Sequence, residues 1–189
     1  KGVFLLRFAL YGHGGSDNHG CEALAKTTAR LARARFPDAR VSLLSYAPEE
    51  DEKAGAVDFD RVVAADIRRF ADPAALIKKP SFEHTRLFTL GKVSRPRADL
   101  YYYSLPYRKH PVGRQLVTED EVYLSIGGDN YCYGEDISGV IAMNFALKKA
   151  GKKTVLWGCS VGEEDLTPHK LRDLATYNLI TARESVTYN

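Results

Sequence analysis

Short apolar runs alternate with amphipathic segments along most of the chain. Residues 3–11 (VFLLRFALY) are apolar at nearly every position, which is typical of a parallel strand that is covered on both faces. Similar runs predict further strands at residues 40–46, 61–65, 121–126, 153–157 and 179–182.

The segments between these strands predict helices. From about residue 20 to residue 36, Leu24, Thr28 and Leu31 share one helical face. The opposite face carries cations (Lys26, Arg30 and Arg33), and Pro37 ends the helix. Further helices are expected around residues 49–56, 137–150 and 166–176.

This alternation predicts an α/β domain with a doubly wound, mainly parallel, Rossmann-like sheet. Parallel neighbours need crossover connections, and these are usually helices. We expect residues 1–189 to form a single domain of this kind. Ligands of such sheets bind beyond the carboxyl ends of the strands, which selects residues 12–20, 127–136 and 158–165 and the turn at Arg183.

The first of these loops (GHGGSDNHG) does not match the common nucleotide motifs. A dinucleotide fingerprint needs a third glycine where Asp17 stands, and a P-loop needs Lys-Ser or Lys-Thr where Cys21 and Glu22 follow Gly20. The Glu22 carboxylate would repel a phosphate, so the loop suits hydroxyl groups better. We therefore expect a polyhydroxylated ligand to contact Asn18, His19 and Glu22. The alternative is that Asp17 or Asn18 caps the helix while Glu22 complements its dipole.

The second loop (SIGGDNY) places paired glycines and a carboxylate directly after a central strand. Gly127 and Gly128 permit close approach of a ligand or of another backbone, and Asp129 with Asn130 would hold sugar hydroxyls. The alternative is the start of another helix, capped by Asp136. The later acidic turn (Glu163, Glu164 and Asp165) is expected to be an exposed, helix-capping turn rather than a metal site.

Cysteine usage and apolar run length suggest a cytoplasmic protein. The three cysteines (Cys21, Cys132 and Cys159) form no CxxC pair and are odd in number, so we expect buried thiols rather than disulfides, with a soft-metal site as the alternative. No metal motif is visible, and none is expected. The run at residues 3–11 is far shorter than the roughly 20 residues of a membrane-spanning helix, and no signal-peptide layout is present.

A basic, aromatic segment spans residues 78–115. It carries nine of the 27 Lys and Arg residues but only two of the 24 acidic ones, interleaved with six Phe and Tyr side chains. This composition suits an anionic surface, and it predicts peripheral membrane contact. Single-stranded nucleic acid would also fit it, although we expect no nucleic-acid partner. The third interpretation is that the segment is a solvent-exposed insertion that contributes some tyrosines to the core.

Four motifs, in order along the chain, resemble those of the polysaccharide pyruvyl transferase family. They are GHGGSDNHGCEAL at residues 12–24, SIGGDNY at 125–131, LWGCSVG at 156–162 and TARESVTY at 181–188. Cys21 departs from the pattern, because many members have Asp at that position.

The resemblance implies a function and a larger architecture. Members resemble two-domain, GT-B-like enzymes that transfer pyruvate from phosphoenolpyruvate to sugar hydroxyls as a ketal, without a cofactor. The chain would then be the amino-terminal, acceptor-side domain, inactive alone, with the catalytic histidine in a second domain that this sequence lacks. Arg183 is the candidate for contacting the donor, because a guanidinium pairs with carboxylate or phosphate in bidentate fashion. The alternative for Arg183 is a structural ion pair with Glu184 or a neighbouring loop.

Acceptors and competing functions follow from the same resemblance. A sugar linked to a lipid or a nucleotide is the expected acceptor, and a lipid link would place the enzyme at a membrane. The alternatives are the acceptor domain of a GT-B glycosyltransferase and a noncatalytic domain that binds sugars or anions.

Overall fold

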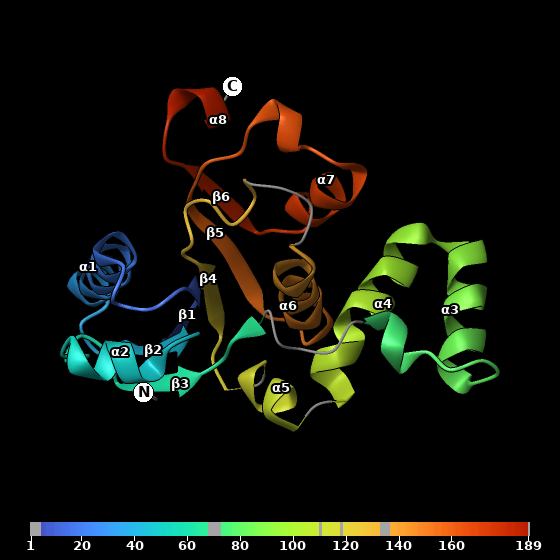
Figure 1. Cartoon of the computed structure of the whole chain (residues 1–189), viewed down its shortest axis with the longest axis horizontal. Helices are drawn as coiled ribbons and strands as arrows, with labels where there is room; N and C mark the ends of the chain where they lie inside the picture. Colours follow the sequence, from blue (N-terminus) through green and yellow to red (C-terminus); the bar gives the residue numbers. More distant parts are fainter. Residues whose placement is uncertain (1–4, 68–72, 110, 118, 133–136, 189) are drawn as a thin grey trace.

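The structure is a computed structural model that describes residues 5–67, 73–109, 111–117, 119–132 and 137–188 (Figure 1). Its centre is one sheet of six parallel strands in the order β3-β2-β1-β4-β5-β6. The strands are β1 (Arg7–His13), β2 (Arg40–Ser45), β3 (Arg61–Ala64), β4 (Val122–Ser125), β5 (Lys153–Cys159) and β6 (Leu179–Ala182). The doubly wound, Rossmann-like prediction is confirmed.

The strand order creates a switch point between β1 and β4. The chain moves outward from β1 to β3 and then returns to place β4 on the other side of β1. Crossovers that leave in opposite directions open a crevice at such a point, where ligands of α/β sheets bind.

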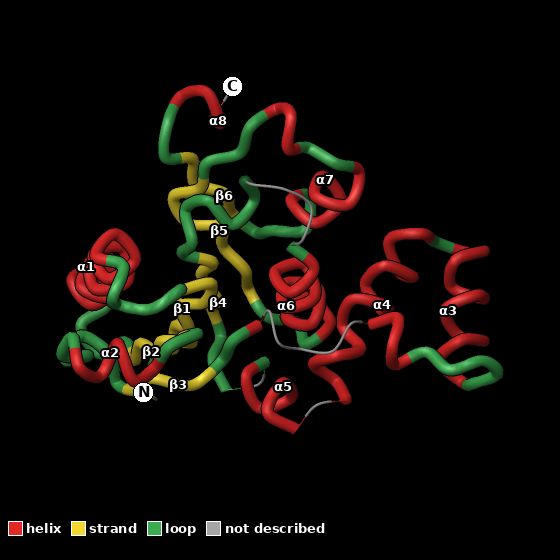
Figure 2. The backbone as a smooth tube through the Cα atoms, in the orientation of Figure 1, coloured by secondary structure: helices red, strands yellow, loops and turns green. Residues whose placement is uncertain are grey.

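Helices cover the sheet on both faces (Figure 2). The helices are α1 (His19–Arg35), α2 (Pro48–Lys53), α3 (Phe82–Val93), α4 (Arg95–Lys109), α5 (Pro111–Leu116), α6 (Ser138–Lys149), α7 (Pro168–Leu174) and α8 (Ser185–Tyr188), with short 3-10 turns at Pro73–Leu76 and Glu163–Asp165. Alternate strand residues point to opposite faces. Phe8 and Leu10 of β1 therefore pack towards α1, and Ala9 and Tyr11 pack towards α4, α5 and α6.

Two predicted strands have different bounds by two or more residues at one or both ends, and the buried face of one helix differs from the prediction. The first strand runs from Arg7 to His13, because Leu5 and Leu6 precede its ladder, and residues 1–4 lie outside the described residues. The strand predicted at 153–157 continues to Cys159. On α1, Leu31 is 55% exposed, and the buried face is Ala25, Thr28 and Ala29. These short side chains bring the helix close to the sheet, so Leu31, on an adjoining face, points to solvent.

Residues 78–115 are mostly helical, which the sequence analysis did not predict. Pro96 lies in the first turn of α4, where its missing N–H breaks no helical bond, and Pro106 lies inside the same helix. Tyr101 and Tyr107 are buried, and Tyr103 packs partly into the core. The interpretation that the segment contributes core tyrosines therefore holds for these three side chains.

No helix among the described residues is both long and apolar enough to cross a bilayer.

Candidate functional site

Polar and glycine-rich segments meet where four neighbouring strands end. The carboxyl ends of β1, β4, β5 and β6 are adjacent in the sheet, and each is followed by one of the segments selected from the sequence. Close contacts and hydrogen bonds join these four segments to one another. We call residues 12–16, 127–130, 158–160 and 183 the rim.

Asn130 joins the loops after β1 and β4 across the switch point. Its side chain lies directly over two glycines. A Cβ built on Gly127 would come within 2.1 Å of Asn130 Oδ1, and one on Gly12 within 2.4 Å of Asn130 Nδ2. The amide also donates from Nδ2 to Ser125 Oγ at 3.1 Å. The glycines therefore make room for a protein side chain at this point, whereas a ligand or another backbone was expected at Gly127.

Arg183 joins the loops after β4, β5 and β6. It donates from Nε and Nη2 to Ser160 Oγ at 3.0 and 2.5 Å. A Cβ on Gly128 would come within 2.8 Å of Arg183 Nη1, so the guanidinium lies against that glycine. The backbone adds a bond from Ser160 N–H to Gly128 O at 2.6 Å. Arg183 also forms an ion pair with Glu184 (Nε to Oε2, 3.5 Å), as the structural alternative for this residue describes, and its side chain stays 52% exposed. Ser160 thus holds one edge of the Arg183 guanidinium, and the side chain remains open to solvent. Asp129 is exposed on the loop after β4.

The start of α1 forms a separate polar group. Asn18 is the N-cap residue, and its Oδ1 accepts from Gly20 N–H at 2.9 Å and Cys21 N–H at 3.2 Å, as the capping alternative describes. Glu22 accepts from Lys26 Nζ at 2.7 Å and lies 3.2 Å from His19 Nδ1. Hydrogen bonds from Lys26 and then His19 lower the pKa of Glu22, so this carboxylate is ionised at neutral pH. The His19 side chain is 93% exposed.

His13 lies at the carboxyl end of β1 and anchors the glycine-rich loop through a buried cluster of hydrogen bonds. It was not singled out from the sequence. Its Nε2 lies 2.7 Å from Asp51 Oδ1, and Ser16 Oγ donates to the same oxygen at 2.5 Å. The His13 and Asp51 side chains are each 1% exposed. The cluster joins the end of β1 to α2. A histidine inside a glycine-rich loop was the only sequence signal for it.

A second buried polar cluster lies beneath the second loop. Tyr131 donates to Asp173 Oδ2 and, at 3.0 Å, contacts the hydroxyl of Tyr177, which lies 3.3 Å from that of Tyr11. Asn144 donates to Asp173 Oδ1 at 2.7 Å. Burial raises the pKa of Asp173 to about 7, although the hydrogen bonds from Tyr131 and Asn144 act in the opposite direction. This network ties the loop after β4 to α6 and α7.

The remaining candidate residues near the rim are the cysteines and the acidic turn at residues 163–165. Cys159 is buried as expected, whereas Cys21 and Cys132 are only half-buried, so the expectation of buried thiols is wrong for these two. Cys132 donates from Sγ to Ser160 O at 3.0 Å. Desolvation raises the pKa of the Cys132 and Cys159 thiols, which keeps them protonated. Among the described residues no three His, Cys, Asp or Glu side chains gather as metal ligands. Thr167, and not the acidic turn at residues 163–165, caps α7, and Asp136 lies outside the described residues.

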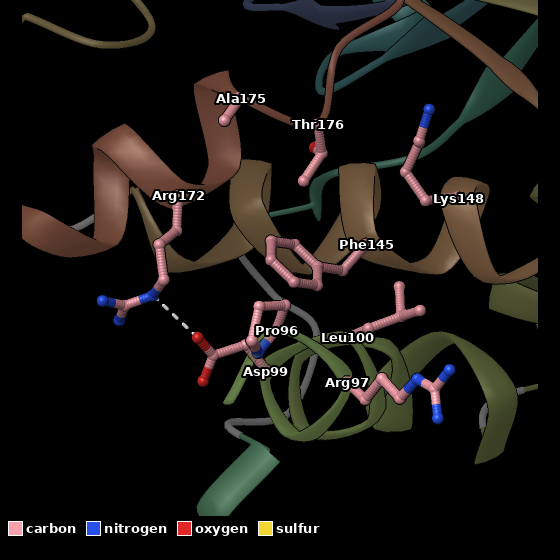
Figure 3. Close-up of a pocket in the computed structure, with 9 residues that line it drawn as sticks. All are labelled: Pro96, Arg97, Asp99, Leu100, Phe145, Lys148, Arg172, Ala175 and Thr176. Carbon is pink, nitrogen blue, oxygen red and sulfur yellow. Dashed lines mark ion pairs between the residues drawn. The ribbon is translucent and has the colours of Figure 1, made fainter. Parts of the chain in front are cut away.

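An apolar cavity of about 410 Å³ lies between α4, α6 and α7, away from the rim (Figure 3). Phe145 and Leu100 line it, and Arg172 Nε pairs with Asp99 Oδ2 at 2.7 Å along one side. Lys148 and Thr176, which also line it, shortly precede β5 and β6. The cavity therefore lies towards the amino ends of those strands, opposite to the rim.

The packing of Asn130 gives a testable expectation for the rim glycines. Gly127→Ala forces Asn130 to turn away and to lose its bond to Ser125, at a cost of about 1 kcal/mol in the free energy of unfolding. Gly12→Ala has the same effect and also places a side chain at φ +81°, which adds about 1–2 kcal/mol. In an Asn130→Ala background, Gly127→Ala should cost little, whereas Gly12→Ala should keep its backbone term. Denaturant unfolding of the wild type, the three single variants and the two double variants tests this, and strictly additive costs would contradict it.

Most of the chain matches one known protein family. The family model described as "Polysaccharide pyruvyl transferase" matches residues 18–189. The chain belongs to the polysaccharide pyruvyl transferase family. The match covers most of the chain, including Asn130, Ser160 and Arg183. It starts at Asn18, after the first residues of the glycine-rich loop. No curated protein and no solved structure matches the chain.

Proposed function

We propose that this chain forms the acceptor side of an enzyme that transfers pyruvate from phosphoenolpyruvate to two hydroxyls of a sugar as a cyclic ketal. The observation that carries the proposal is the seating of Arg183. Ser160 holds one edge of its guanidinium, and the side chain remains 52% exposed beside Gly128. A guanidinium fixed in this way suits a carboxylate or phosphate, and phosphoenolpyruvate carries both.

The acceptor is proposed to lie next to this cation, over the loops after β1 and β4. Asp129 supplies an exposed carboxylate for a sugar hydroxyl. Gly128 is buried against Arg183, so it would act by letting that guanidinium lie close to the acceptor loop. The amide of Asn130 is already engaged with Ser125, so it would offer its remaining hydrogen-bonding capacity. At the start of α1, His19 and Glu22 are proposed to contact the more distant part of the acceptor. Asn18 would act there mainly through the cap that it forms.

The proposed chemistry proceeds in two additions to one carbon. A general acid protonates the terminal carbon of phosphoenolpyruvate, and a sugar hydroxyl attacks the adjacent cationic carbon and releases its proton. Phosphate then leaves with its bridging oxygen, and a second hydroxyl attacks the same carbon and closes the ketal. Arg183 would hold the donor in place and balance its negative charge. We propose that the general acid comes from a second domain, so that this chain alone binds sugars without turnover.

The test is an assay of the full-length protein with phosphoenolpyruvate and a panel of free, nucleotide-linked and lipid-linked sugars. The expected result is phosphate release that depends on the acceptor, with a pyruvylated sugar found by mass spectrometry in equal amount. Phosphate release without that product would contradict the proposal. Hydrolysis of a nucleotide sugar instead would assign a glycosyltransferase, and sugar binding without any product would assign a binding domain.

A further inference from the structure

Helix α3 stands apart from the rest of the fold. It packs against α4, and Figure 1 shows it at the side of the molecule away from the sheet. None of its residues is buried. A helix that contributes so little to the core would be expected to carry a polar outer surface.

The outer surface of α3 instead exposes three large apolar side chains. Phe82 is 68% exposed, Phe88 60% and Val93 72%. At 100° per residue these side chains fall on one side of the helix, together with four other exposed residues. We call this set the α3 outer face, which consists of Phe82, Thr85, Arg86, Phe88, Thr89, Lys92 and Val93.

The charges on the α3 outer face have one sign. Arg86 and Lys92 are both exposed, and the face contains no acidic residue. The one carboxylate of α3, Glu83, lies on the inner side and accepts from Lys109 Nζ at 2.5 Å. Each cation lies near an aromatic ring of the face. Lys92 Nζ is 4.3 Å from the centre of the Phe88 ring. Arg86 Cζ is 5.9 Å from the centre of the Phe82 ring and 5.0 Å from that of Tyr101 on α4, so Arg86 lies at the edge of the face.

We propose that the α3 outer face docks onto the surface of an anionic lipid bilayer. Large apolar side chains next to long cationic ones, without any carboxylate, match the boundary between acyl chains and negatively charged headgroups. Phe82, Phe88 and Val93 enter that boundary, while Arg86 and Lys92 reach the lipid phosphates. This contact does not depend on the proposed reaction, although it would bring the rim towards a lipid-linked acceptor.

The experiment is co-sedimentation of the protein with sucrose-loaded vesicles of phosphatidylcholine, with or without 30% phosphatidylglycerol, at about 0.1 M salt. Binding is expected only with the anionic lipid. Phe82→Ser with Phe88→Ser should weaken partitioning at least about tenfold, because two rings no longer leave water. Arg86→Glu with Lys92→Glu should weaken it more, since each cation near such a surface contributes about fivefold.

Matched controls come from exposed residues elsewhere. Val57→Ser replaces a side chain that is 87% exposed, and Lys53→Glu reverses an exposed charge on α2. Both should bind vesicles like the wild type, and circular dichroism should show that all variants are folded. Equal binding by wild type and the α3 variants, or binding that does not require anionic lipid, would overturn the proposal. A dimer in sedimentation velocity that the Phe82 and Phe88 substitutions abolish would also overturn it, by assigning the face to a second copy of the chain.

Discussion

Replacing Arg183 by alanine is expected to lower kcat/KM for phosphoenolpyruvate about 100-fold in the full-length protein. The expectation rests on the proposed function, in which Arg183 makes two charge-assisted hydrogen bonds to the donor. Each would contribute about 1.5 kcal/mol or more, and each 1.4 kcal/mol changes the rate about tenfold. Arg183→Lys keeps the charge but loses the planar fork, so it should recover only part of the loss. Steady-state kinetics at varied phosphoenolpyruvate concentration provide the measurement.

Two companion variants separate donor binding from a general loss of structure. Ser160→Ala leaves the cation in place but removes the oxygen that orients it, so its effect should be smaller and should fall mainly on KM for the donor. Arg30→Ala removes an exposed arginine that pairs with Asp58 on the outer side of α1, and kinetics like those of the wild type are expected. An Arg183→Ala enzyme with unchanged kcat/KM would show that this arginine serves only the local structure.

Replacing Asp173 by asparagine is expected to abolish a fall in stability between about pH 4 and pH 7. The folded-state pKa of Asp173 is raised to about 7 from its ordinary value of 3.8, mainly because the carboxyl group is buried. In that window the folded chain keeps a proton that the unfolded chain has lost. The free energy of unfolding therefore declines as the pH rises, by at most about 1.4 kcal/mol per pH unit, and levels off above pH 7.

Asparagine cannot ionise, so the two proteins should diverge with pH. Near pH 4.5 their unfolding free energies should be similar, and near pH 7.5 Asp173→Asn should be the more stable by up to about 4 kcal/mol. Urea unfolding across this range measures the difference. Asp38→Asn, at an exposed carboxylate, serves as the control for changes in net charge. A difference between wild type and Asp173→Asn that does not vary with pH would contradict the expectation.

The fold followed from local patterns wherever the pattern was strong. The strand at Leu179–Ala182 has the predicted bounds, and the other strands differ mostly at their ends, where ladder partners decide the last residue. Which residues of α1 face the sheet depends on how closely the helix packs, and sequence periodicity alone did not show that Ala25 and Ala29 would replace Leu31. Helix α4 was missed because Pro96 and Pro106 argue against a helix. Helix α3 was missed because it buries no residue and so has no apolar face towards the core.

The sequence predicted which loops form the site, but it did not predict which side chains form hydrogen bonds with one another there. Parallel strands deliver their following loops to one edge, so Gly12, Gly127, Ser160 and Arg183 could be placed together from the strand order. The partners of each side chain depend on distances that only packing fixes. The bond between Arg183 and Ser160, the position of Asn130 over two glycines and the burial of His13 with Asp51 are of this kind.

The Asn130 side chain limits how closely the end of β1 and the loop after β4 can approach each other. Its amide fills the space over Gly12 of β1 and over Gly127 after β4, so neither loop can move inward without displacing it. A ligand that displaced this amide would change the packing of Gly12 and of Gly127 in the same event.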